Sequence, residues 1–140
     1  MNEPTVFMSD QFTFPKYILH YDGTESRSTH NIYGALNTSA TYSGCVEEGR
    51  RAFILTRSFW TGTQRYAFVW TGDNSANMEH MKVSIDMTLN LGLCGIPFNG
   101  ADVGGFFGSP QHSFIAKWTR LASYAYPFFR NHCIRGADRR

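Results

Sequence analysis

The sequence predicts an α/β fold with a parallel sheet, because short apolar runs alternate with segments of helical periodicity. Three runs have the length and continuity of strands buried on both faces, and they cover residues 52–55, 66–70 and 95–98. Helical patterns lie between the second and third runs and after the third. Strands joined by helical crossovers pair in parallel. We therefore expect the order strand, strand, helix, strand, helix.

The helix between the second and third runs is predicted from Met81, Ile85 and Leu89, which recur every four residues on one face. Asn74 or Ser75 is the expected N-cap of this helix. The helix after the third run is predicted from a cap and first-turn pair at residues 109–110, followed by apolar residues at helical spacing.

A further helix is expected before the first run, within residues 30–42. Asn31 is a suitable N-cap, and Ile32, Tyr33 and Leu36 follow it. Residues 42–50 have the composition of a loop.

Length and composition restrict the classes of protein to consider. The chain has 140 residues, 42% of them hydrophobic, whereas a complete (β/α)8 barrel needs about 250. The net charge of +2 gives no support for a nucleic-acid partner. No apolar stretch is long enough to span a membrane. Three widely spaced cysteines, Cys45, Cys94 and Cys133, lack zinc or redox spacing and leave the disulfide state open.

Ionisable side chains follow the apolar runs. Arg57, Asp73 and Asp102 come after the three runs, and His132 follows a last apolar stretch. In a parallel sheet or barrel the carboxyl ends of the strands form the ligand-binding edge. Taken singly, each of these residues is explained as well by a strand that ends at solvent. Taken together, with aromatic residues nearby at Trp60, Trp70, Phe106 and Phe107, they favour a polyhydroxylated ligand such as a sugar.

Several segments resemble glycoside hydrolase family 31 in collinear order over nearly the whole chain. They are residues 1–4 (MNEP), 55–58 (LTRS), 64–66 (QRY), 70–74 (WTGDN), 100–106 (GADVGGF) and 128–132 (FFRNH). Within the family, residues 30–34 (HNIYG) and 70–74 are most similar to the catalytic α subunits that trim glucose from N-linked glycans. The resemblance implies that residues 1–140 are the C-terminal part of a (β/α)8 TIM barrel, incomplete, with roughly strands 5 to 8 and the preceding loop.

The resemblance also implies a role for each site residue. Asp73 matches the general acid/base of a retaining α-glycosidase, although an Asp at this position could also serve only the start of a helix. The family's nucleophile is the Asp directly before the MNE segment, so we expect it to lie outside this chain and the chain alone to be inactive. The residues expected to bind the cleaved glucose are Met1, Arg57, Trp70, Asp102, Phe106 and His132.

Two pairings accompany these expected roles. Arg57 and Asp102 are expected to pair, so that neither charge is left uncompensated. Trp70 and Phe106 would form an apolar wall for the sugar ring, with core packing as the alternative. Glu3 is interpreted as structural, and Trp118 as a core residue.

By the same resemblance, the expected activity is hydrolysis of terminal α-linked glucose in the endoplasmic reticulum lumen, on an α-glucoside or a glucosylated N-glycan. A non-catalytic β subunit is the expected partner, and the chemistry needs no metal or cofactor. Two alternatives stay open: a non-catalytic carbohydrate-binding or interaction protein derived from the barrel, and another family 31 activity such as an α-xylosidase.

Overall fold

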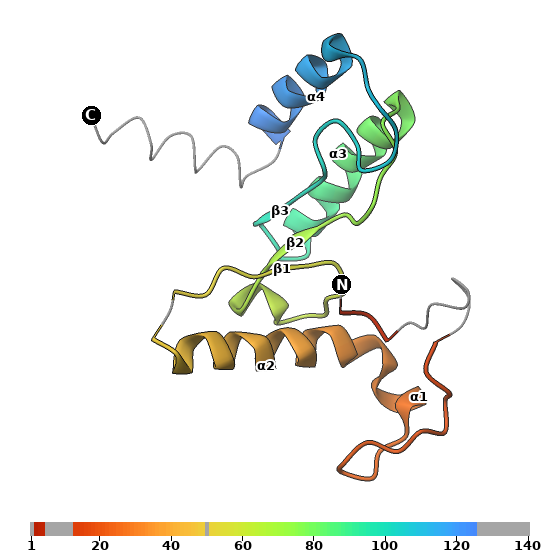
Figure 1. The fold of residues 1–140 in the computed structure, drawn as a ribbon, viewed down its shortest axis with the longest axis vertical. Helices are drawn as coiled ribbons and strands as arrows, with labels where there is room; N and C mark the ends of the chain where they lie inside the picture. Colours follow the sequence, from red (N-terminus) through yellow and green to blue (C-terminus); the bar gives the residue numbers. More distant parts are fainter. Residues whose placement is uncertain (1, 5–12, 50, 126–140) are drawn as a thin grey trace. The chain divides into compact units, whose positions relative to one another are not determined.

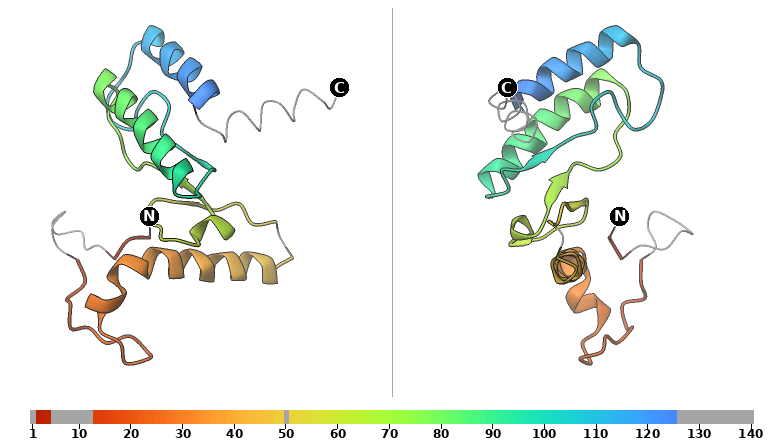
Figure 2. Two further views of the ribbon diagram at one scale, coloured as in Figure 1. Left: turned by 180° about the vertical axis from the view of Figure 1, so that it is seen from behind. Right: turned by 60° about the vertical axis from the view of Figure 1, so that its left-hand side comes forward.

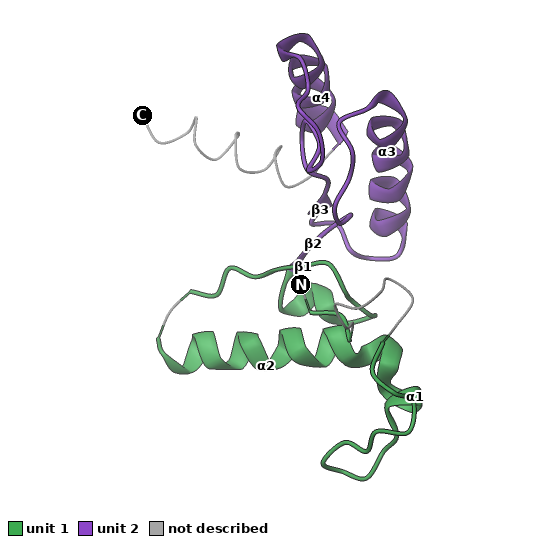
Figure 3. Cartoon of the chain, turned by 45° about the vertical axis from the view of Figure 1, so that its right-hand side comes forward, with its two compact units in different colours: residues 1–67 green, residues 68–140 purple. Residues whose placement is uncertain are grey.

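The computed structural model describes residues 2–4, 13–49 and 51–125, and these form two compact units (Figures 1 and 3). Unit 1 is Met1–Ala67 and unit 2 is Phe68–Arg140. The expected residues Met1 and His132, together with Cys133, lie outside the described residues.

Unit 1 is built around one long helix. A short helix α1 (Ser26–Thr29) and a 3-10 turn η1 (His30–Ile32) lead into α2 (Tyr33–Glu47), and β1 (Leu55–Thr56) and the 3-10 turn η2 (Thr63–Arg65) follow. The predicted helix is therefore present, but Asn31 lies in the 3-10 turn and is not its cap. The loop expected over residues 42–50 is wrong for residues 42–47, because α2 continues to Glu47, and residues 48–49 form a turn.

The buried side of α2 is small and polar. Its buried residues are Gly34 and Thr38, one turn apart, whereas the apolar Leu36 is 57% exposed. A Cβ on Gly34 would lie 2.7 Å from the carbonyl oxygen of Ser58, so glycine is required for this close approach. The Thr38 hydroxyl donates to the carbonyl of Gly34 and contacts the hydroxyl of Thr56.

Unit 2 contains two parallel strands and two helices. The strands are β2 (Phe68–Trp70) and β3 (Asn99–Gly100), and α3 (Met78–Leu93) connects them. β2 and β3 pair in parallel with Val69 opposite Asn99 and Trp70 opposite Gly100. This is the predicted crossover of strand, helix and parallel strand. Both views of Figure 2 show α4 (His112–Ala125) beside α3.

Local interactions define both ends of α3. Its N-cap is Asn77, whose side chain accepts a hydrogen bond of 2.8 Å from the backbone N–H of His80, so the predicted cap at Asn74 or Ser75 is wrong. At the other end Gly95 has a φ of +79°, and the N–H of Ile96 donates to the carbonyl of Leu91. This left-handed glycine ends the helix in a Schellman-type turn.

Trp118 anchors α4 in the core of unit 2. It is fully buried, and Ala122 one turn later is 1% exposed, which confirms the prediction of a core role for Trp118. Phe114 packs edge-to-face on Trp118, with ring centroids 5.5 Å apart. The helix begins two residues beyond the predicted pair at residues 109–110.

Candidate functional site

The two predicted carboxylates of unit 2 both follow strands that end at the same edge. Because Trp70 pairs with Gly100, Asp73 and Asp102 lie three and two residues beyond matched positions of a parallel ladder. The ladder ends with the N–H of Thr71 donating to the carbonyl of Gly100 at 2.9 Å. Asp73 and Asp102 therefore meet at the carboxyl edge of β2 and β3, which is where parallel sheets bind ligands.

Both the burial of Asp102 and the neighbouring Asp73 affect the pKa of its carboxyl group. Asp73 is exposed and Asp102 is partly buried. Burial, and then the negative charge of Asp73, raise the pKa of Asp102 above its ordinary value of 3.8.

Asn74 joins the two segments that carry these carboxylates. The residue is 6% exposed. Its side chain donates to the carbonyl oxygen of Asp102 at 3.1 Å and accepts from the N–H of Phe106 at 2.9 Å. Sequence reasoning considered Asn74 only as a helix cap and missed this role. The available signal was an Asn directly after Asp73, since its amide carries both a donor and an acceptor.

The aromatic residues expected to line the site also lie near this edge. Trp70 is partly buried and sits on the face of β2 opposite the buried Val69, because side chains alternate along a strand. Phe106 is 58% exposed and packs edge-to-face on Phe107, with centroids 4.8 Å apart. An exposed ring is available to a ligand, as a sugar-stacking surface requires.

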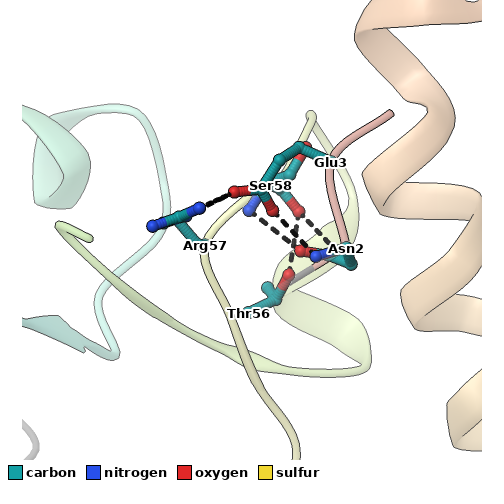
Figure 4. Close-up of polar contacts among 5 residues, drawn as sticks. All are labelled: Asn2, Glu3, Thr56, Arg57 and Ser58. Atoms are coloured by element: carbon teal, nitrogen blue, oxygen red, sulfur yellow. Dashed lines mark hydrogen bonds and ion pairs between the residues drawn. The ribbon is translucent and has the colours of Figure 1, made fainter. Parts of the chain in front are cut away.

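Arg57 lies in unit 1, at the end of β1, where it forms an ion pair with Glu3 (Figure 4). Both Nε and Nη2 of Arg57 bond to Glu3 Oε1, while Glu3 Oε2 accepts from the N–H of Asn2 at 2.8 Å. Burial pushes the pKa of Glu3 up, but hydrogen bonds from the backbone and from Arg57 together hold it below its ordinary value. Glu3 thus has the structural surroundings expected of it. The expected pairing of Arg57 with Asp102 stays a prediction.

Asn2 connects three segments of unit 1. Its amide nitrogen donates to the carbonyl of Gly34 at 2.9 Å and to the carbonyl of Ser58 at 3.0 Å, and its amide oxygen accepts from the N–H of Ser58 at 3.1 Å. Figure 4 shows this side chain beside Thr56 and Ser58. No role was predicted for Asn2, because its partners are up to 56 residues away in sequence.

The described residues also bear on other kinds of site. They contain no group of three or more His, Cys, Asp or Glu placed to hold a metal ion. Among them, none of the helices combines the length and the apolar character that crossing a membrane would take. Cys45 and Cys94 are not bonded to each other.

Comparisons with known proteins agree on a family. All 140 residues match the description "Glycosyl hydrolases family 31 TIM-barrel domain". A protein of Arabidopsis thaliana named "Probable glucan 1,3-alpha-glucosidase" is 50% identical over all of this chain and 15% of its own length. The mouse protein named "Neutral alpha-glucosidase AB" is 45% identical over all of this chain and 15% of its length.

Solved structures give the same answer for the fold. The crystal structure of a glucosidase II α subunit, bound to α3-Glc2, matches 92% of this chain and 14% of its own, with a TM-score of 0.85 and 44% identity. The same figures hold for a crystal structure of an ER glucosidase II heterodimeric complex of the catalytic subunit and the binding domain of the regulatory subunit. The chain thus spans about one seventh of the relatives it matches. It belongs to glycosyl hydrolase family 31, within the TIM-barrel domain of that family.

Proposed function

We propose that residues 1–140 form roughly strands 5 to 8 of the catalytic barrel of a retaining exo-α-glucosidase, in which Asp73 is the acid/base. The observation that carries this proposal is the meeting of Asp73 and Asp102 at the carboxyl edge of the parallel β2–β3 pair. In (β/α)8 enzymes the catalytic groups come from this edge of the strands. Membership of family 31 supports the reaction class.

The proposed mechanism has two displacements. A nucleophilic carboxylate attacks the anomeric carbon, and Asp73 gives its proton to the departing oxygen. Asp73 then removes a proton from water, which releases glucose with retained configuration. The two carboxyl groups of such enzymes lie about 5–5.5 Å apart. By family resemblance the nucleophile directly precedes Met1, so these 140 residues supply the acid/base and not the nucleophile.

The glucose to be cleaved would be held by residues with complementary chemistry. Arg57, Asp102 and His132 would bond its hydroxyl groups, while Trp70, Phe106 and Met1 would contact its apolar surfaces. Partial exposure of Trp70 and Phe106 supports this role for the two rings. A charged donor and acceptor on one sugar give directional hydrogen bonds, which select a polyhydroxylated ligand.

The proposed substrate is a terminal α-linked glucose, of the kind removed during N-glycan trimming. The support is the likeness to glucosidase II α subunits, one of them with α3-Glc2 bound. The complex with a regulatory subunit supports a non-catalytic β subunit as partner and the endoplasmic reticulum lumen as location.

The role of Asp73 can be tested by replacing Asp73→Ala in the full-length protein that we propose for this chain. The variant should lose hydrolysis of an α-linked glucose disaccharide by about 100-fold or more, because the leaving sugar then departs unprotonated. It should still react with α-glucosyl fluoride, whose leaving group needs little proton donation. Azide, which attacks without a base, should restore turnover and yield α-glucosyl azide.

The control is Glu79→Ala, which removes an exposed carboxylate from the first turn of α3. This variant should keep its activity and show no response to azide. Equal loss on the disaccharide and the fluoride by Asp73→Ala, without azide rescue, would overturn the assignment.

A further inference from the structure

We infer that Asn74 is a positioning residue that fixes the acid/base segment and the backbone of the loop from Asp102 to Phe106 as one rigid body. This inference rests on the proposed function, since it assigns Asn74 a task in the same reaction. It concerns only contacts within unit 2.

Asn74 holds the loop of residues 102–107 with both its side chain and its backbone. The side-chain amide spans the loop from the Asp102 carbonyl to the Phe106 N–H. The backbone carbonyl of Asn74 accepts from the N–H groups of Phe106 and Phe107, each at 2.9 Å. The N–H of Ala76 then donates to the carbonyl of Phe107 at 2.8 Å. Five hydrogen bonds thereby join four groups of residues 74–76 to four groups of residues 102–107, and the bonded residues are 28 or more positions apart in sequence.

The backbones of the two segments approach each other closely at Gly105 and Ala76. Gly105 has a φ of +94°, and a Cβ built on it would lie 2.6 Å from the Cα of Ala76. The N–H of Gly105 closes the loop by donating to the carbonyl of Asp102 at 3.2 Å. Any shift of the Asp102 loop would therefore move the backbone that follows Asp73.

Asparagine is the side chain that this position needs. Its amide offers a donor to the Asp102 carbonyl and an acceptor to the Phe106 N–H at the same time. Aspartate has nearly the same shape, but it would bring a second acceptor against the Asp102 carbonyl and add a charge beside two carboxylates. Alanine would remove both side-chain bonds, so the Asp102 carbonyl would keep only the Gly105 N–H and the Phe106 N–H would keep only the backbone carbonyl of residue 74.

The consequence for catalysis is specific to proton transfer. Asp73 directly precedes Asn74, so loss of the Asn74 side-chain hydrogen bonds moves the acid away from the departing oxygen. A misplacement of about 1 Å costs on the order of 100-fold in rate. Substrates whose leaving group must be protonated should suffer this loss, and substrates with a good leaving group should not.

The test is Asn74→Asp in the full-length protein, assayed on an α-linked glucose disaccharide and on α-glucosyl fluoride. We expect kcat/KM on the disaccharide to fall by about 100-fold. The fall in kcat/KM on the fluoride should be about 10-fold or smaller. The matched control is Asn77→Asp, which adds the same charge at the exposed cap of α3, where aspartate caps equally well. It should leave both values unchanged.

Equal losses on the two substrates would overturn the inference, because a merely structural defect does not discriminate between leaving groups. Unchanged activity of Asn74→Asp would overturn it as well. If this variant does not fold, as judged by its circular dichroism and melting, Asn74→Ser provides the same comparison without added charge. Asp73→Ala separates the two proposals. If the loss depends on the leaving group for Asp73→Ala but not for the Asn74 variant, only the positioning role is rejected. If it depends on the leaving group for neither variant, the proposed function is rejected.

Discussion

Glu3 keeps its charge because its surroundings favour the ionised form. Both Glu3 oxygens accept hydrogen bonds, one from Arg57 and one from the N–H of Asn2. These bonds outweigh burial and hold the pKa of Glu3 below 4.5. The residue therefore links the start of the chain to the end of β1 through an ion pair that exists only while its carboxyl is ionised.

This linkage has a defined pH dependence. A folded-state pKa below the ordinary value means that Glu3 stabilises the fold above that value, and that the stabilisation is lost as pH falls through the folded pKa. Glu3→Gln should lower the melting temperature of the full-length protein at neutral pH, through a loss of up to about 1 kcal/mol. The gap from wild type should close as the pH falls through the folded-state pKa of Glu3, which lies below 4.5.

The matched control for this measurement is Glu25→Gln. Glu25 pairs with Arg27, and both side chains are largely solvent-exposed at 42% and 57%. Its replacement should leave the melting temperature unchanged at every pH. A Glu3→Gln gap that is constant with pH would contradict the linkage.

At the scale of elements, α2 shows that close approach can replace apolar burial. Gly34 lets the helix backbone reach Ser58, and Asn2 bonds to both residues. Gly34→Ala should destabilise the protein by about 1–3 kcal/mol, because its Cβ has no room. Gly44→Ala, in the same helix, meets nothing within 4 Å and should stabilise by about 0.5–1 kcal/mol. Thermal melting of both variants checks the pair, and equal signs would refute it.

The same helix explains what sequence periodicity could and could not predict. The apolar residues Tyr33 and Leu36 predict a helix, but its buried face is formed by Gly34 and Thr38. Ser43 and Gly44 in the same helix are weak helix formers, so composition does not reveal that the helix continues to Glu47. Likewise the apolar runs located the strands, but the ladder residues Asn99 and Gly100 lie just beyond the third run, because pairing depends on the partner strand.

The residue types of the candidate site could be proposed from the sequence, but the contacts that support them could not. Asp73 and Asp102 were found because charged residues after apolar runs occupy the carboxyl edge of a parallel sheet. The side-chain hydrogen bonds of Asn74 join it to partners 28 and 32 residues away, which no local sequence pattern reveals. The helix cap was misassigned for the same reason: Asn74 and Asn77 are equal candidates in sequence, and the amide of Asn74 is engaged elsewhere.

At the scale of the whole molecule, many large apolar side chains of the described residues face solvent. Phe53 and Leu55, around β1, are 65% and 51% exposed, and Leu93 at the end of α3 is 86% exposed. Exposed apolar surface and unpaired strand edges promote association. We therefore expect the 140 residues alone to be poorly soluble, and a sharp cooperative melt of a soluble monomer would contradict this.

The isolated 140-residue chain should also fail to hydrolyse α-glucosides. Retaining hydrolysis needs a nucleophilic carboxylate in addition to the acid/base, and we propose that only Asp73 of this pair is present. A purified preparation, incubated with an α-linked glucose disaccharide, should release no glucose above the level of its own Asp73→Ala variant. The full-length protein is the positive control. Steady release of glucose by the isolated chain, abolished by Asp73→Ala, would mean that a carboxylate within these residues serves as the nucleophile, and the two-segment mechanism would have to be abandoned.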